Sequence, residues 1–120
     1  MNHLNSIILE GNCVNDAVLT EPKAGFKVCK ITIAVNRKIK NADGETVEEV
    51  SYFDTECYGH MAEISVNAAK KGRGLRIVGR LKQSRWEDEG VSKSKVYVVA
   101  EHIEYKPSFK SSEKEAEKTA

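Results

Sequence analysis

A two-residue alternation of apolar and other side chains is the feature that most constrains how this chain can fold. In residues 75–86, Leu75, Ile77 and Leu81 share one parity, while basic residues and finally Trp86 take the other. Successive side chains of a strand point to opposite faces, so this pattern predicts a half-buried β-strand. Comparable runs predict four further strands over residues 6–12, 26–35, 50–58 and 96–105.

The order of the predicted elements indicates one fold class. Residues 60–71 are the one helical window, because Met61, Ile64 and Ala68 recur at helical spacing and Gly72 follows as a stop. Five strands with a helix between the third and the fourth are typical of a small Greek-key barrel, the oligonucleotide/oligosaccharide-binding (OB) fold. An immunoglobulin-like sandwich would need about seven strands and no such helix. We therefore expect an all-β, five-stranded barrel with one short helix.

Long β-hairpin loops should project from this barrel. Residues 37–49 are polar and contain the turn signal Asn-Ala-Asp-Gly, which predicts a long exposed loop. A short extended piece is expected over residues 17–20, and a turn over residues 87–95. The barrel domain should cover residues 1–106, whereas residues 107–120 are rich in Ser, Lys, Glu and Ala and are expected to form a disordered polar tail.

Basic residues are segregated along the chain, although its net charge is only +1. Residues 70–85 contain many cations and no acid, and Trp86 follows; residues 22–42 are also free of acids. An aromatic ring beside cations on a rigid strand suits the bases and phosphates of a single-stranded nucleic acid. The alternative is a solvated strand face with the tryptophan folded into the core. The two basic blocks must meet in the fold for the nucleic-acid interpretation to hold.

Cysteine usage and hydropathy restrict the compartment. Cys13, Cys29 and Cys57 are an odd number without Cys-x-x-Cys spacing, so free thiols in a reducing compartment are expected. The sequence has no secretion signal and no run of 18 apolar residues. We therefore expect a cytoplasmic protein with no membrane partner.

Patterns for metal binding and catalysis are missing from the sequence. His3, His60 and His102 are scattered and have no Cys or carboxylate partners at ligand spacing. The sequence contains neither a phosphate-cradling Gly-x-x-x-x-Gly-Lys motif nor a nucleophile elbow. We expect a binding protein without catalytic residues, metal or cofactor, although the fold alone does not exclude a small hydrolase.

Six stretches, taken in their order and spacing, carry a family resemblance. They are NSIILEGN (5–12), ITIAVN (31–36), SYFDTECYGHMAE (51–63), KKGRGLRIVGRL (70–81), RWED (85–88) and VVAEHI (98–103). Across residues 3–105 the chain resembles the bacterial single-stranded DNA-binding protein family. The resemblance implies a nucleoid-associated protein that wraps and protects single-stranded DNA during replication, recombination and repair. It also implies a homotetramer, with a dimer as the open alternative.

Candidate contacts follow from strand parity together with this resemblance. Stacking on bases is implied for Trp86, Tyr58 and Tyr52, although aromatics at strand spacing are also often core residues. Tyr52 shares its predicted face with Asp54 and Glu56, whose charge would repel phosphate. Binding would combine stacking with phosphate tracking and would not read sequence. The cations expected to contact phosphate are Arg76, Arg80, Lys82, Arg85, Arg37, Lys38 and Lys30.

Two departures from the family pattern keep an alternative open. The stacking aromatic usual after the second strand has no counterpart, since Arg37, Lys38 and Ile39 occupy the nearby positions. The sequence ends on Thr119 and Ala120 rather than on the acidic tip with an apolar pair that recruits replication and repair enzymes. A primosomal-type accessory protein on the same barrel, docking a helicase or its loader, is the alternative function.

Overall fold

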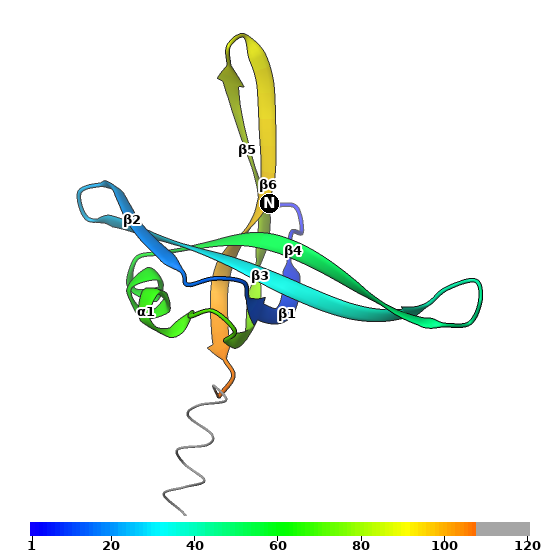
Figure 1. Ribbon diagram of the computed structural model, residues 1–120. Coiled ribbons are helices and arrows are strands. Elements are labelled where there is room, and N and C mark those ends of the chain that lie inside the picture. Colours follow the sequence, from blue (N-terminus) through cyan, green and yellow to red (C-terminus); the bar gives the residue numbers. More distant parts are fainter. Residues whose placement is uncertain (108–120) are drawn as a thin grey trace, which may run out of the picture.

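The computed structural model describes residues 1–107 (Figure 1). The tail predicted over residues 107–120 lies, apart from Pro107, outside the described residues. The described chain contains β1 (Ile7–Cys13), β2 (Val18–Lys23), β3 (Phe26–Lys40), β4 (Thr46–Tyr58), α1 (His60–Ala68), β5 (Gly74–Asp88) and β6 (Val91–Tyr105), in this order.

Five of these strands close into a barrel. Hydrogen bonding follows the order β1-β5-β6-β4-β3, and β1 pairs back onto β3 through Asn12 opposite Ala34 and Cys13 opposite Ile33. β2 continues along the same edge of β3, beginning with Val18 opposite Lys30. A closed sheet has no free edge within the barrel, which is one solution to the edge-strand problem of small all-β proteins. The predicted five-stranded barrel with one helix is confirmed.

The structure adds one strand to the predicted order. The extended piece expected over residues 17–20 is part of a full strand, β2, so α1 follows the fourth strand of the chain and not the third. The helix also ends at Ala68 instead of continuing to residue 71, and the chain turns through Gly72 at a φ of 87°. Glycine tolerates this left-handed conformation because it has no Cβ. The relative order of the predicted strands and helix is otherwise unchanged.

The first of two hairpin arms continues β3 and β4 beyond the barrel. Antiparallel pairing runs without interruption to Lys40 opposite Thr46, so most of the loop predicted over residues 37–49 is a two-stranded ribbon. The turn at its tip is closed by Asn41, whose Oδ1 accepts hydrogen bonds from the backbone N of Asp43 and Glu45, each at 3.0 Å. We call residues 36–50 the β3–β4 arm.

The second arm consists of the ends of β5 and β6. Their pairing extends to Asp88 opposite Val91, which replaces most of the turn predicted over residues 87–95 with strand. The two arms leave the barrel in different directions (Figure 1). We call residues 81–97 the β5–β6 arm.

The core lies inside the barrel, and α1 contributes to it from one side. Ala62 and Ser65 of the helix are buried, and the O–H group of Tyr105 on β6 donates to Ser65 Oγ at 2.6 Å. This hydrogen bond joins the helix to the end of the last strand. The barrel residues of the core include Cys13, Cys29, Ile31, Ile33, Cys57, Leu75, Ile77 and Val98. The three cysteines are buried and are free thiols in the structure.

No helix within residues 1–107 has the length and apolar character needed to cross a bilayer.

Candidate nucleic-acid interface

The outer face of β4 forms one wall of the candidate interface. Its residues alternate as the sequence predicts, with Thr55 and Cys57 buried in the barrel and Tyr52 and Asp54 exposed. β3 is paired alongside, so Ala34 lies opposite Tyr52, and Thr32 lies opposite Asp54. Side chains directly opposite one another in an antiparallel pair share one face. The outer wall therefore includes residues of both strands.

The β5–β6 arm supplies the second wall. In its register, Lys82 lies opposite Tyr97, Ser84 opposite Lys95, and Trp86 opposite Lys93. Because side chains alternate along each strand, these six residues share one face of the arm. This face turns toward β4, since several of the six line a hollow together with residues of β3 and β4. This hollow has a volume of about 260 Å³, and its lining includes Lys30, Thr32, Asp54, Glu56, Ser84, Trp86, Lys95 and Tyr97.

A second hollow continues this surface toward the β2–β3 turn. It measures about 410 Å³ and shares Lys30 and Glu56 with the first hollow. Its lining also includes Thr20, Pro22, Phe26, Val28, Tyr58 and Lys82. We call the combined surface, with Trp86 at one end and Tyr58 and Phe26 at the other, the aromatic groove.

Trp86 is held in the groove without being buried. Its exposed fraction is 45%, and it lies on the arm beyond the part of β5 that pairs with β1, where the barrel interior has ended. Indole is a large flat surface whose exposure costs hydration free energy, which makes it a suitable stacking partner for a ligand ring. The placement is therefore consistent with the predicted stacking role and not with a core position.

Tyr58 is more firmly embedded than Trp86. Its ring stacks on Phe26 with 5.5 Å between centroids and 24° between planes. Its O–H group donates to Glu56 Oε2 at 3.0 Å. Burial, together with the neighbouring Glu56 carboxylate, raises the pKa of Tyr58 above its ordinary value, so the phenol stays protonated. Tyr52 differs, since 65% of it is exposed.

Opposite charges meet inside the groove. Lys95 Nζ lies 2.7 Å from Asp54 Oδ2, and Thr32 Oγ1 donates to Asp54 Oδ1 at 3.0 Å. The hydrogen bond from Lys95, the largest favourable contribution, holds the pKa of the Asp54 carboxyl below its usual range. Lys30 lies opposite Glu56 in the β3–β4 register. The groove is thus a mixed surface and not a purely basic one.

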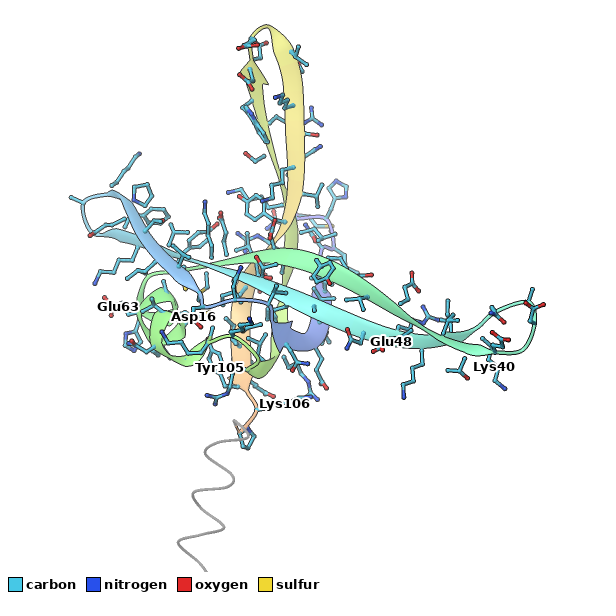
Figure 2. The ribbon with its side chains drawn as sticks, in the orientation of Figure 1. Asp16, Lys40, Glu48, Glu63, Tyr105 and Lys106 are labelled. Carbon is cyan, nitrogen blue, oxygen red and sulfur yellow. The ribbon has the colours of Figure 1, made fainter. Side chains whose placement is uncertain are left out.

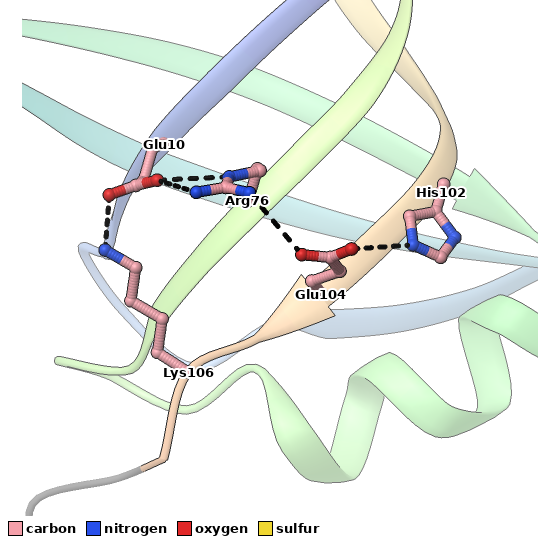
Figure 3. A network of polar contacts seen from close by, with 5 residues as sticks. All are labelled: Glu10, Arg76, His102, Glu104 and Lys106. Carbon is pink, nitrogen blue, oxygen red and sulfur yellow. Dashed lines mark hydrogen bonds and ion pairs between the residues drawn. The ribbon is translucent and has the colours of Figure 1, made fainter.

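Arg76 and Arg80 lie outside the groove in ion pairs with acids of the neighbouring strands. Arg76 donates from Nε and Nη2 to Glu10 Oε2 at 3.1 and 3.0 Å, and its Nη1 lies 3.7 Å from Glu104 Oε2. Lys106 also pairs with Glu10, as Figure 3 shows. Lys106 and then Arg76 hold the pKa of the Glu10 carboxyl below its usual value. Arg80 Nη1 lies 3.5 Å from Glu101 Oε1. Arg76 and Arg80 are among the cations expected to contact phosphate, but in the structure carboxylates of neighbouring strands already pair with both.

The other predicted cations are divided among three places. Lys30 and Lys82 line the aromatic groove. Arg85 lies on the opposite face of the arm from Trp86, where its Nε and Nη2 donate to Gln83 Oε1 at 3.3 and 3.1 Å. Arg37 and Lys38 are exposed on the β3–β4 arm, opposite Glu49 and Glu48. Figure 2 shows Lys40 and Glu48 on the same arm, well away from the barrel.

Three aromatic or basic residues of the groove were missed from the sequence. Phe26 begins β3, and Lys95 and Tyr97 lie on β6 opposite Ser84 and Lys82. Tyr97 and Lys95 are two positions apart. A predicted last strand that began near Gly90 instead of at residue 96 would therefore have placed both on one face. Treating residues 87–95 as a turn concealed that relationship. For Phe26, the first residue of its strand, we find no sequence signal that separates a groove position from a core position.

The topology and the groove define a class of protein, the OB-fold barrels, in which a curved sheet and its hairpins form a ligand-binding surface. The model of the single-strand binding protein family matches residues 4–106. The chain therefore belongs to the single-strand binding protein family.

Similar proteins support this assignment. The single-stranded DNA-binding protein of Aquifex aeolicus (strain VF5) is 40% identical over 100 residues, covering 83% of this chain and 68% of that protein. The single-stranded DNA-binding protein of Treponema pallidum (strain Nichols) is 38% identical over 104 residues, covering 87% of this chain and 58% of that protein. The chain thus spans about three fifths to two thirds of the length of these curated relatives.

Solved structures show the same fold. A deletion mutant of the single-stranded DNA binding protein from Thermus aquaticus aligns with a TM-score of 0.76 at 26% identity, covering 85% of this chain and 50% of that chain. The Plasmodium falciparum SSB complex with ssDNA aligns with a TM-score of 0.79 at 17% identity, covering 88% of this chain and 96% of that chain. At 17% identity the second likeness concerns the fold alone.

Proposed function

We propose that this chain binds single-stranded DNA without reading its sequence and protects it during replication, recombination and repair. Family membership and the names of the relatives support the ligand class. The observation that carries the proposal is the half-exposed Trp86 in a groove that also presents Lys30 and Lys82. Unstacked bases have two exposed π-faces, and their phosphates need cations at short range.

In the proposed mechanism, bases stack on aromatic rings while lysines track the phosphates. Trp86 and Tyr58 are the proposed stacking residues in the groove, and Tyr52 extends the surface along β4. Lys30 and Lys82 contact phosphates there, and Arg37 and Lys38 do so along the β3–β4 arm. Stacking tolerates every base, so the contact area and not hydrogen-bond readout sets the affinity. The protein acts by binding and performs no catalysis.

A docking protein for a helicase or its loader is the less favoured function. Both relatives described above carry the name single-stranded DNA-binding protein.

We further propose that residues 1–106 suffice for DNA binding, that the chain assembles as a homotetramer, and that it works in the bacterial cytoplasm at the nucleoid. The mass in solution, measured by light scattering, distinguishes a tetramer from a dimer.

Titration of oligo(dT) into the protein, followed by the fluorescence of Trp86, tests the proposed ligand. Stacking should quench the indole, and a duplex of equal length should bind far more weakly. If about five phosphates are neutralised per barrel, the logarithm of the association constant should fall with the logarithm of the salt concentration at a slope of about 3 to 4. Equal affinity for duplex DNA would contradict the proposal.

A further inference from the structure

The ion pair between Asp54 and Lys95 links the barrel to the β5–β6 arm across the aromatic groove. Asp54 projects from β4, Lys95 projects from β6, and their charged atoms lie 2.7 Å apart. β4 and β6 themselves pair over only two positions, Thr55 opposite Val98 and Glu56 opposite Val99. The ion pair between Asp54 and Lys95 therefore lies next to this short β4–β6 pairing, on the side of the β5–β6 arm.

Asp54 puts a negative charge inside a surface proposed to receive a polyanion. The hollow beside Trp86 contains two lysines, Lys30 and Lys95, together with Asp54 and Glu56. Glu56 already accepts a hydrogen bond from Tyr58 and lies opposite Lys30. The two carboxylates therefore compete with phosphate for the same ammonium groups, and Asp54 is the one in direct contact with a lysine of the arm.

We infer that Asp54 limits the affinity for single-stranded DNA, because it holds Lys95 in an ion pair that a phosphate must replace. The inference rests on the proposed function. Asp54 acts through Lys95 and is therefore a positioning residue, not a stacking or phosphate-binding residue. Thr32 keeps the carboxylate in place by donating to its second oxygen at 3.0 Å.

The size of the effect follows from the exposure of the pair. The side chains of Lys95 and Asp54 are 54% and 46% exposed, so water and salt already weaken their attraction. Such pairs contribute little, and releasing Lys95 should strengthen binding by only about three- to fivefold, the upper part of the range for exposed pairs. One additional lysine available to phosphate should also steepen the salt dependence of binding to a single strand by about 0.7.

The test uses Asp54→Asn, which keeps the shape of the side chain and an oxygen that accepts from Thr32. Its affinity for a fluorescein-labelled oligo(dT) is measured by anisotropy at several salt concentrations, beside the wild type. Asp54→Ser serves as a second variant, and thermal melting shows that both remain folded. We expect tighter binding and a steeper salt dependence for both variants.

Glu63→Gln is the matched control, because it also removes one carboxylate from an exposed ion pair. Glu63 Oε1 lies 2.5 Å from Lys27 Nζ and joins α1 to β3, and neither residue lines the two hollows of the groove. If the gain came from net charge alone, Glu63→Gln would tighten binding as much as Asp54→Asn, and the inference would be overturned. We expect a change of less than about twofold for the control, since the lysine that it releases does not line the groove and salt screens exposed charges.

A double-mutant cycle assigns the effect to Lys95. Lys95→Gln should weaken binding by less than about twofold in the wild type, where Asp54 occupies the ammonium group, and by about threefold or more in the Asp54→Asn background. Equal losses in both backgrounds, or an Asp54→Asn variant that binds no more tightly, would overturn the inference. If the wild type itself fails to bind oligo(dT), the proposed function is wrong instead, so the two failures are distinguishable.

Discussion

The rings of Phe26 and Tyr58 are stacked, with 5.5 Å between their centroids and 24° between their planes. Phe26 is 45% exposed, whereas Tyr58 is half-buried and still lines the groove. The pair joins the first residue of β3 to the last residue of β4. One end of the aromatic groove is thus a preassembled aromatic platform, and the other end depends on Trp86 of the arm.

Replacing Trp86 should weaken DNA binding and leave the fold intact. Trp86→Ala is expected to cost about 1–3 kcal/mol of binding free energy per barrel, the usual value of one stacked base. Anisotropy of a labelled oligo(dT) measures this loss without needing the intrinsic fluorescence. Trp86→Phe is the control and should recover most of the affinity. A variant that no longer melts cooperatively would show that the indole belongs to the core.

Tyr58 and Tyr52 should separate into different phenotypes. Tyr58→Ala removes the partner of Phe26 and the hydrogen bond to Glu56, so both the melting temperature and the DNA affinity should fall. Tyr52→Ala removes a side chain that is 65% exposed, so the melting temperature should stay within a few degrees and only affinity should decrease. Both losses of affinity should be smaller than that of Trp86→Ala. A greater loss at Tyr52 than at Trp86 would contradict this ranking.

Two basic residues of β5 should differ in their importance for DNA. Lys82 lines the groove, and Lys82→Gln should weaken binding and flatten the salt dependence by about 0.7. Arg76 is already paired with Glu10 and Glu104, so Arg76→Gln should leave that slope nearly unchanged. Salt titrations of both variants measure the difference. The opposite ranking would mean that the ion pairs of Arg76 open when DNA binds.

The buried thiols should resist modification in the folded protein. Burial raises the pKa of Cys29 to about 12 and that of Cys13 to about 11, and it also raises the pKa of Cys57. The thiolate is the reactive form, so almost none is present at neutral pH. A disulfide-exchange reagent should titrate no thiol in the folded chain and three in denaturant. Rapid reaction of one thiol without denaturant would show that its strand opens readily.

Gly79 should be intolerant of any side chain. A Cβ at this position would lie 2.1 Å from the carbonyl oxygen of Val99 on the neighbouring strand, which is backbone and cannot move aside cheaply. Gly79→Ala should therefore lower the free energy of unfolding by about 1–3 kcal/mol or more. Gly74→Ala is the control, because its Cβ would meet only side-chain atoms of Asn12 and Lys106, the nearest at 3.2 Å. Chemical denaturation of both variants makes the comparison.

Strand parity predicted the barrel well because its strands have one buried face. Thr55 and Cys57 point inward, and Tyr52 and Asp54 point outward, as the alternation requires. The same reasoning fails for Leu81, which was expected inside but is 43% exposed. β5 pairs with β1 only as far as Gly79, so Leu81 lies where the strand leaves the barrel.

The arms and the ion pairs could not be predicted from the local sequence. Residues 37–49 resemble a loop because a two-stranded ribbon has no interior and therefore no apolar alternation. Arg76 pairs with Glu10, which lies 66 positions away in the chain. The absence of acids from a local segment therefore does not show whether its basic side chains are paired with carboxylates in the fold. The alternation in the sequence predicted the outer face of β4 with its acids Asp54 and Glu56, whereas the acids that pair with Arg76 and Arg80 follow only from the strand register.

Beyond the barrel, the β3–β4 arm presents two strand edges to solvent without a further strand beside them in the described chain. Such edges can recruit strands of other molecules and begin edge-to-edge aggregation. Here Arg37 faces Glu49 and Lys38 faces Glu48 across the ribbon, so charge accompanies the exposed backbone groups. Replacing these four charged residues with apolar ones would leave the exposed strand edges free to pair with other molecules. The β3–β4 arm would then promote self-association of the protein.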